Sequence, residues 1–327
     1  MKQRQLGTDG PMVGAIGLGC MSFGGPYGPT TEAECFRTLA RAHDLGVTHL
    51  DTANIYGNGV SEQTIGAYIA RSGHEFVIAT KAGIINQPVR RYDNSEAHIR
   101  SSLEDSLRRL GREHVELFYI HRREADRPIE EVMETLARLK QEGKIGAIGL
   151  SEVSPGTLER AQAIHPVAAV QSEYSLWTRL PDLGLIRACE TYGTAFVAFS
   201  PVARGMLTGR IPDPRDFADT DFRKASPRFI EPNYSLNLKR IQAFNAFARD
   251  TGRSPAALAI AWVLHRTGAA IPIPGTRTAE HLEEDVAAAD MVLTASDIAT
   301  IEELLPVGFA HGDRYSDRQA SGPERYC

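Results

Sequence analysis

Residues 46–57 read GVTHLDTANIYG, a short apolar run that ends in Asp51 and is followed five residues later by Tyr56 and a glycine. Two later strand-like runs also end in ionisable side chains, Phe76–Lys81 in a lysine and Val115–His121 in a histidine. Short runs of apolar and β-branched residues are typical of buried strands. We therefore predict that a carboxylate, a phenol, an amine and an imidazole follow the ends of three successive strands.

Strand-like runs alternate with longer helical patterns along the whole chain. The other expected strands are Ala15–Leu18, Val47–Asp51, Ile145–Ser151, Val167–Glu173, Ala195–Ser200 and Ala269–Pro272. The expected helices are Thr31–Leu45, Glu62–Ala70, Ser95–Leu110, Ile129–Gln141, Pro155–Ile164, Pro181–Tyr192, Leu236–Thr251, Pro255–Arg266, Thr278–Ala288 and Ser296–Leu305. Eight strands that are each followed by a helix are typical of a (β/α)8 TIM barrel.

The residues outside this pattern predict four additions to the barrel. They are an N-terminal extension, a long loop over Val202–Asn233 after the seventh strand, an extra helix, and a polar tail over Val307–Cys327. The tail has no apolar period, so we expect it to form no core of its own. Because no Ser-, Gly- or Pro-rich linker divides the chain, we predict a single domain over residues 1–327.

The composition excludes several classes of protein. The 327 residues are 42% hydrophobic and 24% charged, with a net charge of -5, which suits a folded chain with a sizeable core. No Lys/Arg-rich run marks a nucleic-acid surface, and no apolar stretch reaches the roughly 20 residues that span a bilayer. The first residues lack the apolar centre of a signal peptide. We therefore expect a cytoplasmic protein without nucleic-acid or membrane partners, and the oligomeric state stays open.

The cysteines and histidines give no sign of a metal or redox centre. Cys20, Cys35, Cys189 and Cys327 are widely separated and form no C-x-x-C pair. The ten histidines include no H-E-x-x-H motif. We therefore expect reduced thiols and no metal site.

The four strand-end groups suit the protonation of a carbonyl oxygen. A carboxylate such as Asp51 keeps Lys81 charged, and the ammonium lowers the pKa of the Tyr56 phenol from its ordinary value of about 10. The His121 imidazole can donate a hydrogen bond to the oxygen as negative charge develops there. Because no nucleophile is evident, we expect a hydride from a cofactor to attack the carbon. Taken singly, each residue is also compatible with a loop cap, a packed side chain or a surface charge.

The chain resembles the aldo-keto reductases from Leu6 to about Asp285. The DTANIYG motif at 51–57 and the lysine and histidine at the next strand ends match that family. The resemblance implies a TIM barrel that reduces an aldehyde or ketone with NADPH, and it leaves NADH use open. GLGCM at 17–21 and GDRY at 312–315 are similar to one branch, often called the thirteenth family. The implied catalytic tetrad, with the tyrosine as general acid, is Asp51, Tyr56, Lys81 and His121.

The resemblance also implies a cofactor site across the barrel mouth. Ser151 and Gln171 would hold the nicotinamide carboxamide, and Phe199 would stack on the nicotinamide ring. Ser200–Thr208 is similar to the pyrophosphate loop, and Ile273–Arg277 with the following helix is similar to the adenosine 2′-phosphate site. The implied cofactor residues are Gly19, Met21, Asp51, Ser151, Gln171, Phe199, Ser200, Pro201, Val202, Ala203, Arg204, Gly205, Leu207, Gly275, Thr276, Arg277, His281, Glu284 and Asp285.

Three residues depart from the family pattern. Glu152 stands where many members have an asparagine beside the carboxamide. His281 and Asp285 replace the more usual Arg or Gln and Asn near the adenosine. These departures leave the strength of the NADPH preference open, whereas the reaction type is unaffected.

The substrate pocket is expected to be aromatic and apolar, which favours a hydrophobic or cyclic carbonyl compound. In the resembling family C-terminal segments fold over the mouth, so the tail is expected to shape substrate choice. Phe23 and Trp177 have an alternative role, because their rings can pack at the barrel rim without contacting the substrate. Neither the physiological substrate nor the direction of the reaction can be read from the sequence. The expected pocket residues are Phe23, Tyr27, Tyr56, Ile84, His121 and Trp177.

Three other interpretations account for parts of the sequence. GLGCMS at 17–22 begins like a dinucleotide-binding fingerprint, but Ser22 takes the place of the third glycine and two prolines interrupt the required helix. A barrel aldolase would use Lys81 as a Schiff-base nucleophile, which leaves the spacing of Asp51 and Tyr56 unexplained. A cofactor-binding sensor barrel with weak reductase activity, like the potassium-channel β subunits of the family, stays open.

Overall fold

Eight parallel strands form the centre of the molecule in a computed structural model that describes residues 1–8 and 10–326. The Gly17 N–H donates to the Pro272 carbonyl at 3.0 Å, and a bridge pairs Gly19 with Gly275, so the first strand meets the last. The sheet is thus a TIM barrel, as predicted. In sheet order its strands are β3 (Leu18–Gly19), β4 (His49–Asp51), β5 (Val77–Ala82), β8 (Val115–Ile120), β9 (Ile145–Ser151), β10 (Ala169–Glu173), β11 (Ala195–Phe199) and β12 (Ala270–Ile273).

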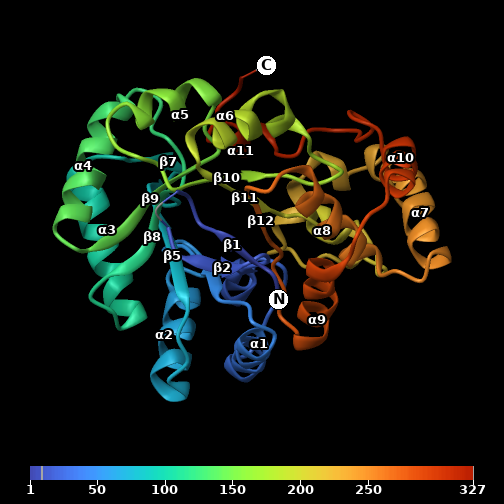
Figure 1. The fold of residues 1–327 in the computed structure, drawn as a ribbon, viewed down its shortest axis with the longest axis horizontal. Helices are drawn as coiled ribbons and strands as arrows, with labels where there is room; N and C mark the ends of the chain where they lie inside the picture. Colours follow the sequence, from blue (N-terminus) through green and yellow to red (C-terminus); the bar gives the residue numbers. More distant parts are fainter. Residues whose placement is uncertain (9, 327) are drawn as a thin grey trace.

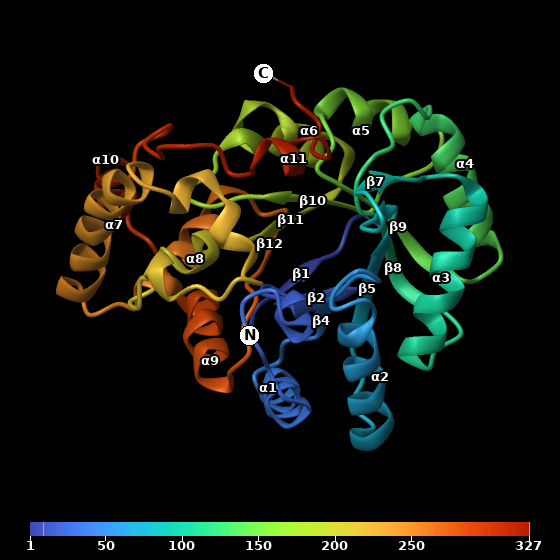
Figure 2. The ribbon, with the colours of Figure 1, turned by 180° about the vertical axis from the view of Figure 1, so that it is seen from behind.

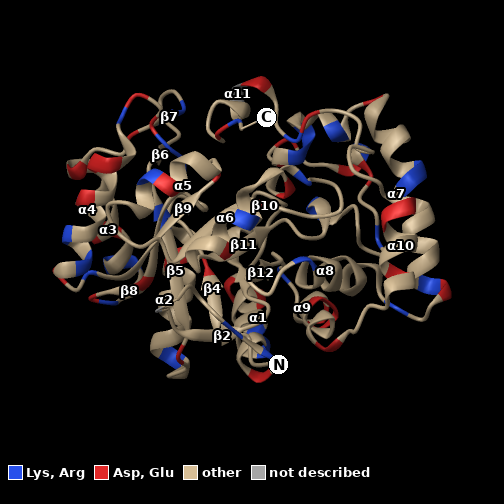
Figure 3. Cartoon of the chain, turned by 45° about the horizontal axis from the view of Figure 1, so that its top comes forward, with Lys and Arg blue, Asp and Glu red and all other residues tan. Residues whose placement is uncertain are grey.

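Helices surround the strands, and Lys, Arg, Asp and Glu of both signs lie along their outer faces (Figure 1 and Figure 3). One expected helix, Pro181–Tyr192, is divided, because Gly184 has a φ of 131° between a 3-10 turn and α6. The α-helices are α1 (Glu32–Asp44), α2 (Val60–Ser72), α3 (Glu96–Leu110), α4 (Ile129–Gln141), α5 (Pro155–Gln162), α6 (Leu185–Tyr192), α7 (Asn233–Asp250), α8 (Pro255–Arg266), α9 (Ala279–Val286), α10 (Ala295–Leu304) and α11 (Asp317–Ala320).

Local sequence signals fix where these helices begin and which face they bury. Ser95 accepts a hydrogen bond from the His98 N–H at the start of α3, and Gly111 ends that helix in the left-handed conformation. The expected apolar stripe of α3, which includes Ile99 and Leu103, is buried against the barrel. Side-chain caps likewise begin α1, α5, α8, α9 and α10, whereas α2, α4, α6 and α7 begin without one.

The N-terminal extension forms a hairpin, which the sequence did not reveal. Strands β1 (Gln3–Gln5) and β2 (Met12–Gly14) pair antiparallel, and Leu6 and Val13 pack with side chains of the barrel interior. A second unpredicted hairpin, β6 (Ile84–Ile85) with β7 (Arg91–Tyr92), follows β5. The second hairpin matters for function because it stands beside the carboxyl ends of the strands.

The C-terminal segment is more structured than its polar composition suggested. Phe309 is buried in the main core, and α11 forms a short helix further on. The segment runs from α10 across the molecule to the region of α5 and α6 (Figure 2). Cys20, Cys35 and Cys189 are free and buried, whereas Cys327 lies outside the described residues. Among residues 1–8 and 10–326, no helix is both long and apolar enough to cross a membrane.

Candidate active site

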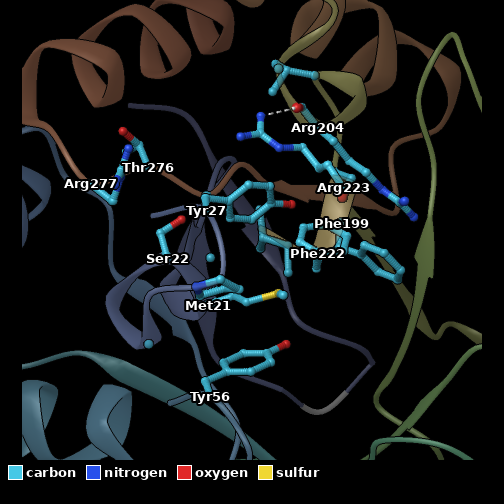
Figure 4. Close-up of a pocket in the computed structure, with 18 of the residues that line it drawn as sticks. Met21, Ser22, Tyr27, Tyr56, Phe199, Arg204, Phe222, Arg223, Thr276 and Arg277 are labelled. Carbon is cyan, nitrogen blue, oxygen red and sulfur yellow. Dashed lines mark hydrogen bonds between the residues drawn. The ribbon is translucent and has the colours of Figure 1, made fainter. Parts of the chain in front are cut away.

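A cavity of about 910 Å³ opens at the carboxyl ends of the barrel strands. Residues at the ends of β3, β4, β8, β10, β11 and β12 line it, together with the β6–β7 hairpin, the loop after β11 and the C-terminal segment. Figure 4 shows Tyr56 on one side of this cavity and Arg277 on another, with Met21 and Ser22 between them. Active sites of TIM barrels are built at this end of the fold.

The structure brings the four strand-end groups together. The Lys81 ammonium donates to the Asp51 carboxylate, to the Thr52 carbonyl at 2.8 Å and to the Tyr56 hydroxyl at 3.3 Å. The His121 ring meets the Tyr56 ring edge to face, with ring centroids 5.7 Å apart. Aspartate, lysine, phenol and imidazole therefore form one contiguous cluster, in which only the lysine lies behind the cavity wall and is fully buried.

Burial, and not the lysine, decides the direction of the Tyr56 pKa. Loss of hydration raises the pKa of the phenol, and the opposing effect of the Lys81 ammonium does not cancel it. The sequence predicted a lowered value, because it showed the neighbouring amine without the surroundings of the ring. For Lys81 burial lowers the pKa, but Asp51 and Tyr56 outweigh that effect and raise it. The site therefore holds a neutral phenol beside a charged ammonium.

His121 is held in its neutral form. Its burial lowers the pKa well below the ordinary value, and the charges of Arg122, Lys81 and Arg90 lower it further. A neutral imidazole keeps one N–H to donate and cannot act as a cation. Its Nδ1 atom is buried without a hydrogen-bond partner among the described residues.

Most of the expected cofactor residues lie along the cavity wall. Those that line it are Gly19, Met21, Asp51, Gln171, Phe199, Ser200, Pro201, Val202, Arg204, Gly205, Gly275, Thr276, Arg277, His281, Glu284 and Asp285. Ser151, Ala203 and Leu207 are buried behind the wall, and the Ser151 hydroxyl accepts a hydrogen bond from Arg122 at 3.0 Å. Gln171 donates to the second oxygen of Asp51 at 2.7 Å, which ties it to the cluster of strand-end groups.

The expected substrate residues divide into two groups. Tyr27, Tyr56, Ile84 and His121 line the cavity. Phe23 and Trp177 are buried and do not line the cavity. Phe23 packs in the main core. The Trp177 ring packs on the Phe229 ring, with 5.6 Å between the ring centroids, and the Arg228 guanidinium lies over it. Their large rings fill the barrel rim, which is the alternative the sequence had left open.

Several polar lining residues escaped the sequence reasoning. Arg122 directly follows His121, so its position at the end of a strand is a signal that the sequence contains. Arg90 lies on a hairpin that no periodic pattern marked, and Arg210 and Arg223 lie within the long loop after β11. Arginines are common on protein surfaces, so residue type alone did not distinguish these four. Other polar residues of the lining that were not expected include Ser22, Asn86, Thr220, Tyr315 and Gln319.

A buried charge network connects the C-terminal segment to the cavity wall. Arg204 donates to Glu173 at 2.8 Å and to the Arg314 carbonyl at 2.7 Å, and the Arg314 guanidinium pairs with Glu152. Burial raises the pKa of Glu173, but Arg204, Arg314 and Arg228 outweigh it and lower that pKa to about 2. Glu152, which departs from the usual asparagine, thus has a structural partner in this chain.

Comparisons with known proteins agree with this architecture. Residues 15–306 match the Aldo/keto reductase family. The NADP(+) aldo-keto reductase yakc of Schizosaccharomyces pombe is 36% identical over 320 residues, 95% of this chain and 94% of that protein. A probable aldo-keto reductase of Glycine max is 36% identical over 315 residues, 95% of this chain and 91% of that protein.

Two solved structures are also similar. A glycerol dehydrogenase from Gluconobacter oxydans has a TM-score of 0.83 and 29% identity, covering 93% of this chain and 94% of its own. The holo form of an aldo-keto reductase from Bacillus halodurans has a TM-score of 0.77 and 26% identity, covering 98% and 99%. The chain belongs to the aldo/keto reductase family, and it is an oxidoreductase by that membership.

Proposed function

We propose that the protein reduces an aldehyde or ketone to an alcohol with NADPH, using Tyr56 as the proton donor. The observation that carries this proposal is the hydrogen-bonded series from Asp51 through Lys81 to the Tyr56 hydroxyl at the cavity wall. The series ends in a protonated phenol at neutral pH, which is the state a general acid requires.

The residues present fit an extended dinucleotide. The cavity is at the upper end of the roughly 300–1,000 Å³ typical of ligand sites, and Arg210, Arg223 and Arg277 supply cations along it. The backbone of Ser200, Ala203 and Arg204 adopts positive φ values of 52° to 58°, a costly conformation for side-chain-bearing residues that recurs at ligand-binding loops. The yakc relative is named for NADP(+), which supports the same cofactor here.

Each member of the cluster has a separate task in the reduction. NADPH, when bound, supplies the hydride that forms the new C–H bond. Tyr56 donates its proton to the carbonyl oxygen, and the charged Lys81 stabilises the phenolate that is left behind. Asp51 keeps the ammonium charged and oriented. Neutral His121 donates a hydrogen bond that positions the oxygen as negative charge develops on it.

The alternatives find less support in the geometry. A Schiff-base aldolase needs a neutral amine, whereas the contacts of Lys81 with Asp51 and Tyr56 raise its pKa. A sensor barrel with weak activity would not require a complete proton-donating cluster.

Tyr315 and Gln319 line the cavity, and we propose that the C-terminal segment influences substrate choice through them.

Replacing Tyr56 by phenylalanine tests the proposal. Removal of a general acid costs about 10²- to 10⁴-fold in rate, so carbonyl reduction followed by NADPH absorbance should fall by at least about 100-fold. NADPH affinity, measured by fluorescence, should stay close to that of the wild type. Tyr192→Phe, on the exposed end of α6, is the matched control. Activity of Tyr56→Phe within about tenfold of wild type, a barrier change below about 1.4 kcal/mol, would overturn the assignment.

A further inference from the structure

Two arginines at the substrate side of the cavity have no carboxylate partner. Arg122 directly follows His121, and Arg90 ends the turn that leads into β7. Both line the cavity, and neither forms an ion pair with any acidic side chain that the structure describes. Arg204 pairs with Glu173 and Arg314 with Glu152, whereas Arg4 and Arg228, which also lack a carboxylate partner among the described residues, do not line the cavity.

Arg122 is bonded only to uncharged oxygens. Its Nη1 donates to the His121 carbonyl at 2.6 Å and to the Ser151 hydroxyl at 3.0 Å, and its Nη2 reaches the Tyr315 hydroxyl at 3.5 Å. The side chain is 7% exposed. A buried guanidinium is costly unless an anion compensates it, so a nearly enclosed arginine in the cavity wall without such a partner favours an anion inside the cavity.

Arg90 places a second charge beside the same space. Its Nε reaches the Tyr92 hydroxyl at 3.4 Å, and its guanidinium lies 5.9 Å from the centre of that ring. Arg90 is half-buried in the cavity wall. Both arginines act on His121, whose pKa they help to lower. The two cations therefore impose a positive potential close to the reacting groups.

The acidic groups of the cavity do not neutralise this region. Asp51 is already bonded to Lys81 and Gln171. Glu284 and Asp285 belong to the α9 segment with Arg277, which Figure 4 shows away from Tyr56. No other carboxylate is found among the described residues of the cavity wall.

We propose that Arg90 and Arg122 form an anion-binding subsite, and that the preferred substrate is an aldehyde or ketone that carries a carboxylate. This inference rests on the proposed reductase function. The sequence led us to expect a hydrophobic or cyclic carbonyl compound as substrate, and the inference adds that this compound carries a negative charge. Arginine holds carboxylates with paired, charge-assisted hydrogen bonds, and a removed charge-assisted bond typically costs about tenfold or more in binding.

Charge-matched substrates test the subsite. We would compare kcat/KM for 4-formylbenzoate with that for 4-formylbenzamide, and likewise for the two 3-formyl isomers, because these pairs differ mainly in charge. The expected result is a preference for the acid of about tenfold or more in at least one pair. Equal values in both pairs would overturn the subsite, while reduction of the amides would still uphold the proposed function.

Variants of one hairpin then locate the effect. Arg90→Gln should reduce the acid-to-amide ratio by about tenfold, and Arg90→Lys should keep most of it, because the charge remains. Arg91→Gln is the matched control, since Arg91 is the exposed neighbour on β7 and is not part of the cavity wall. An unchanged ratio in Arg90→Gln, or an equal loss in Arg91→Gln, would contradict the proposal.

A binding measurement separates the inference from the proposed function. In calorimetry with NADP⁺ present, 4-carbamoylbenzoate should bind the wild-type protein at least about tenfold more tightly than terephthalamide, and Arg90→Gln should remove that difference. If none of the aldehydes is reduced, the reductase proposal fails, and this titration still decides whether the anion subsite exists. Equal binding of the two compounds to the wild type would refute the subsite.

Discussion

Arg314 donates from both terminal nitrogens to the Glu152 carboxylate, with 2.9 Å between Nη1 and Oε1. The same carboxylate accepts the Glu173 N–H at 2.8 Å, and the Glu152 carbonyl accepts the Glu324 N–H at 2.9 Å. The loop after β9 is thus the anchor of the C-terminal segment. The acid at position 152 supplies a negative charge opposite the arginine, which an asparagine would not do.

Removing Arg314 should destabilise the protein markedly. Arg314→Ala leaves the buried Glu152 without its partner, and loss of one member of a buried ion pair costs about 3–5 kcal/mol. Urea unfolding at neutral pH measures this loss. Arg325→Ala, at an exposed position of the same segment, is the control. A loss below about 0.5 kcal/mol for Arg314→Ala, the size of an ordinary surface substitution, would contradict the anchoring role.

Glu173 should make stability depend on pH in the acid range. Because its folded-state pKa is about 2, below the ordinary 4.5, its contribution is complete above about 4.5 and is lost as pH falls towards 2. Glu173→Gln should be less stable at neutral pH, since Arg204 loses its partner. Its unfolding free energy should also fall less steeply below about pH 4.5, by up to about 1.4 kcal/mol per pH unit. Parallel curves for the two proteins would count against this prediction.

Arg277 should set the preference for NADPH over NADH. Its Nη1 donates to the Pro29 carbonyl at 2.7 Å at the cavity wall, two residues before α9, and no described carboxylate pairs with it. A lost charge-assisted bond to a 2′-phosphate costs about 1.5–3 kcal/mol, so Arg277→Ala should weaken NADPH binding about 10- to 100-fold. NADH binding should change little, as should both affinities in Arg37→Ala on the exposed face of α1. Fluorescence titration gives all of these values, and equal affinities of the wild type for the two cofactors would refute the prediction.

Asp285 should couple cofactor affinity to pH. Burial raises its pKa well above the ordinary value, with a further contribution from Glu284, so the carboxyl group stays protonated into a range where most aspartates are charged. Ionisation then places a negative charge in the wall of a site for an anionic dinucleotide, and affinity should fall as pH rises. Asp285→Asn should lose this dependence. Comparing the two proteins at each pH cancels the titration of the cofactor itself, and identical profiles would argue against the assignment.

The barrel could be predicted because its signals are local. Each strand is a short apolar run, and each run is followed by a helical pattern, in several cases with a side-chain cap such as Ser95 at the start of α3. The strand ends then bring Asp51, Lys81 and His121 to one mouth without further information. The boundaries differ from the expected ones by a few residues at most, except where Gly184 divides a helix.

What the sequence did not reveal depends on distant contacts. The direction of the Tyr56 pKa follows from the burial of its ring, which neighbouring residues in the chain do not show. Glu152 looked like a weakened cofactor contact because its partner, Arg314, lies 162 residues away. Likewise Arg90 and Arg122 became notable only when the structure showed which arginines lack a carboxylate.

The separation of Glu152 and Arg314 along the chain has a consequence for biosynthesis. Glu152 is translated 162 residues before the arginine that compensates its charge. A nascent chain can form the strands and collapse its apolar core early, because domains begin to fold as they emerge. It stays electrostatically incomplete until Arg314 has been added, so a chain that stops before this residue would hold a barrel in which the buried Glu152 has lost its cation.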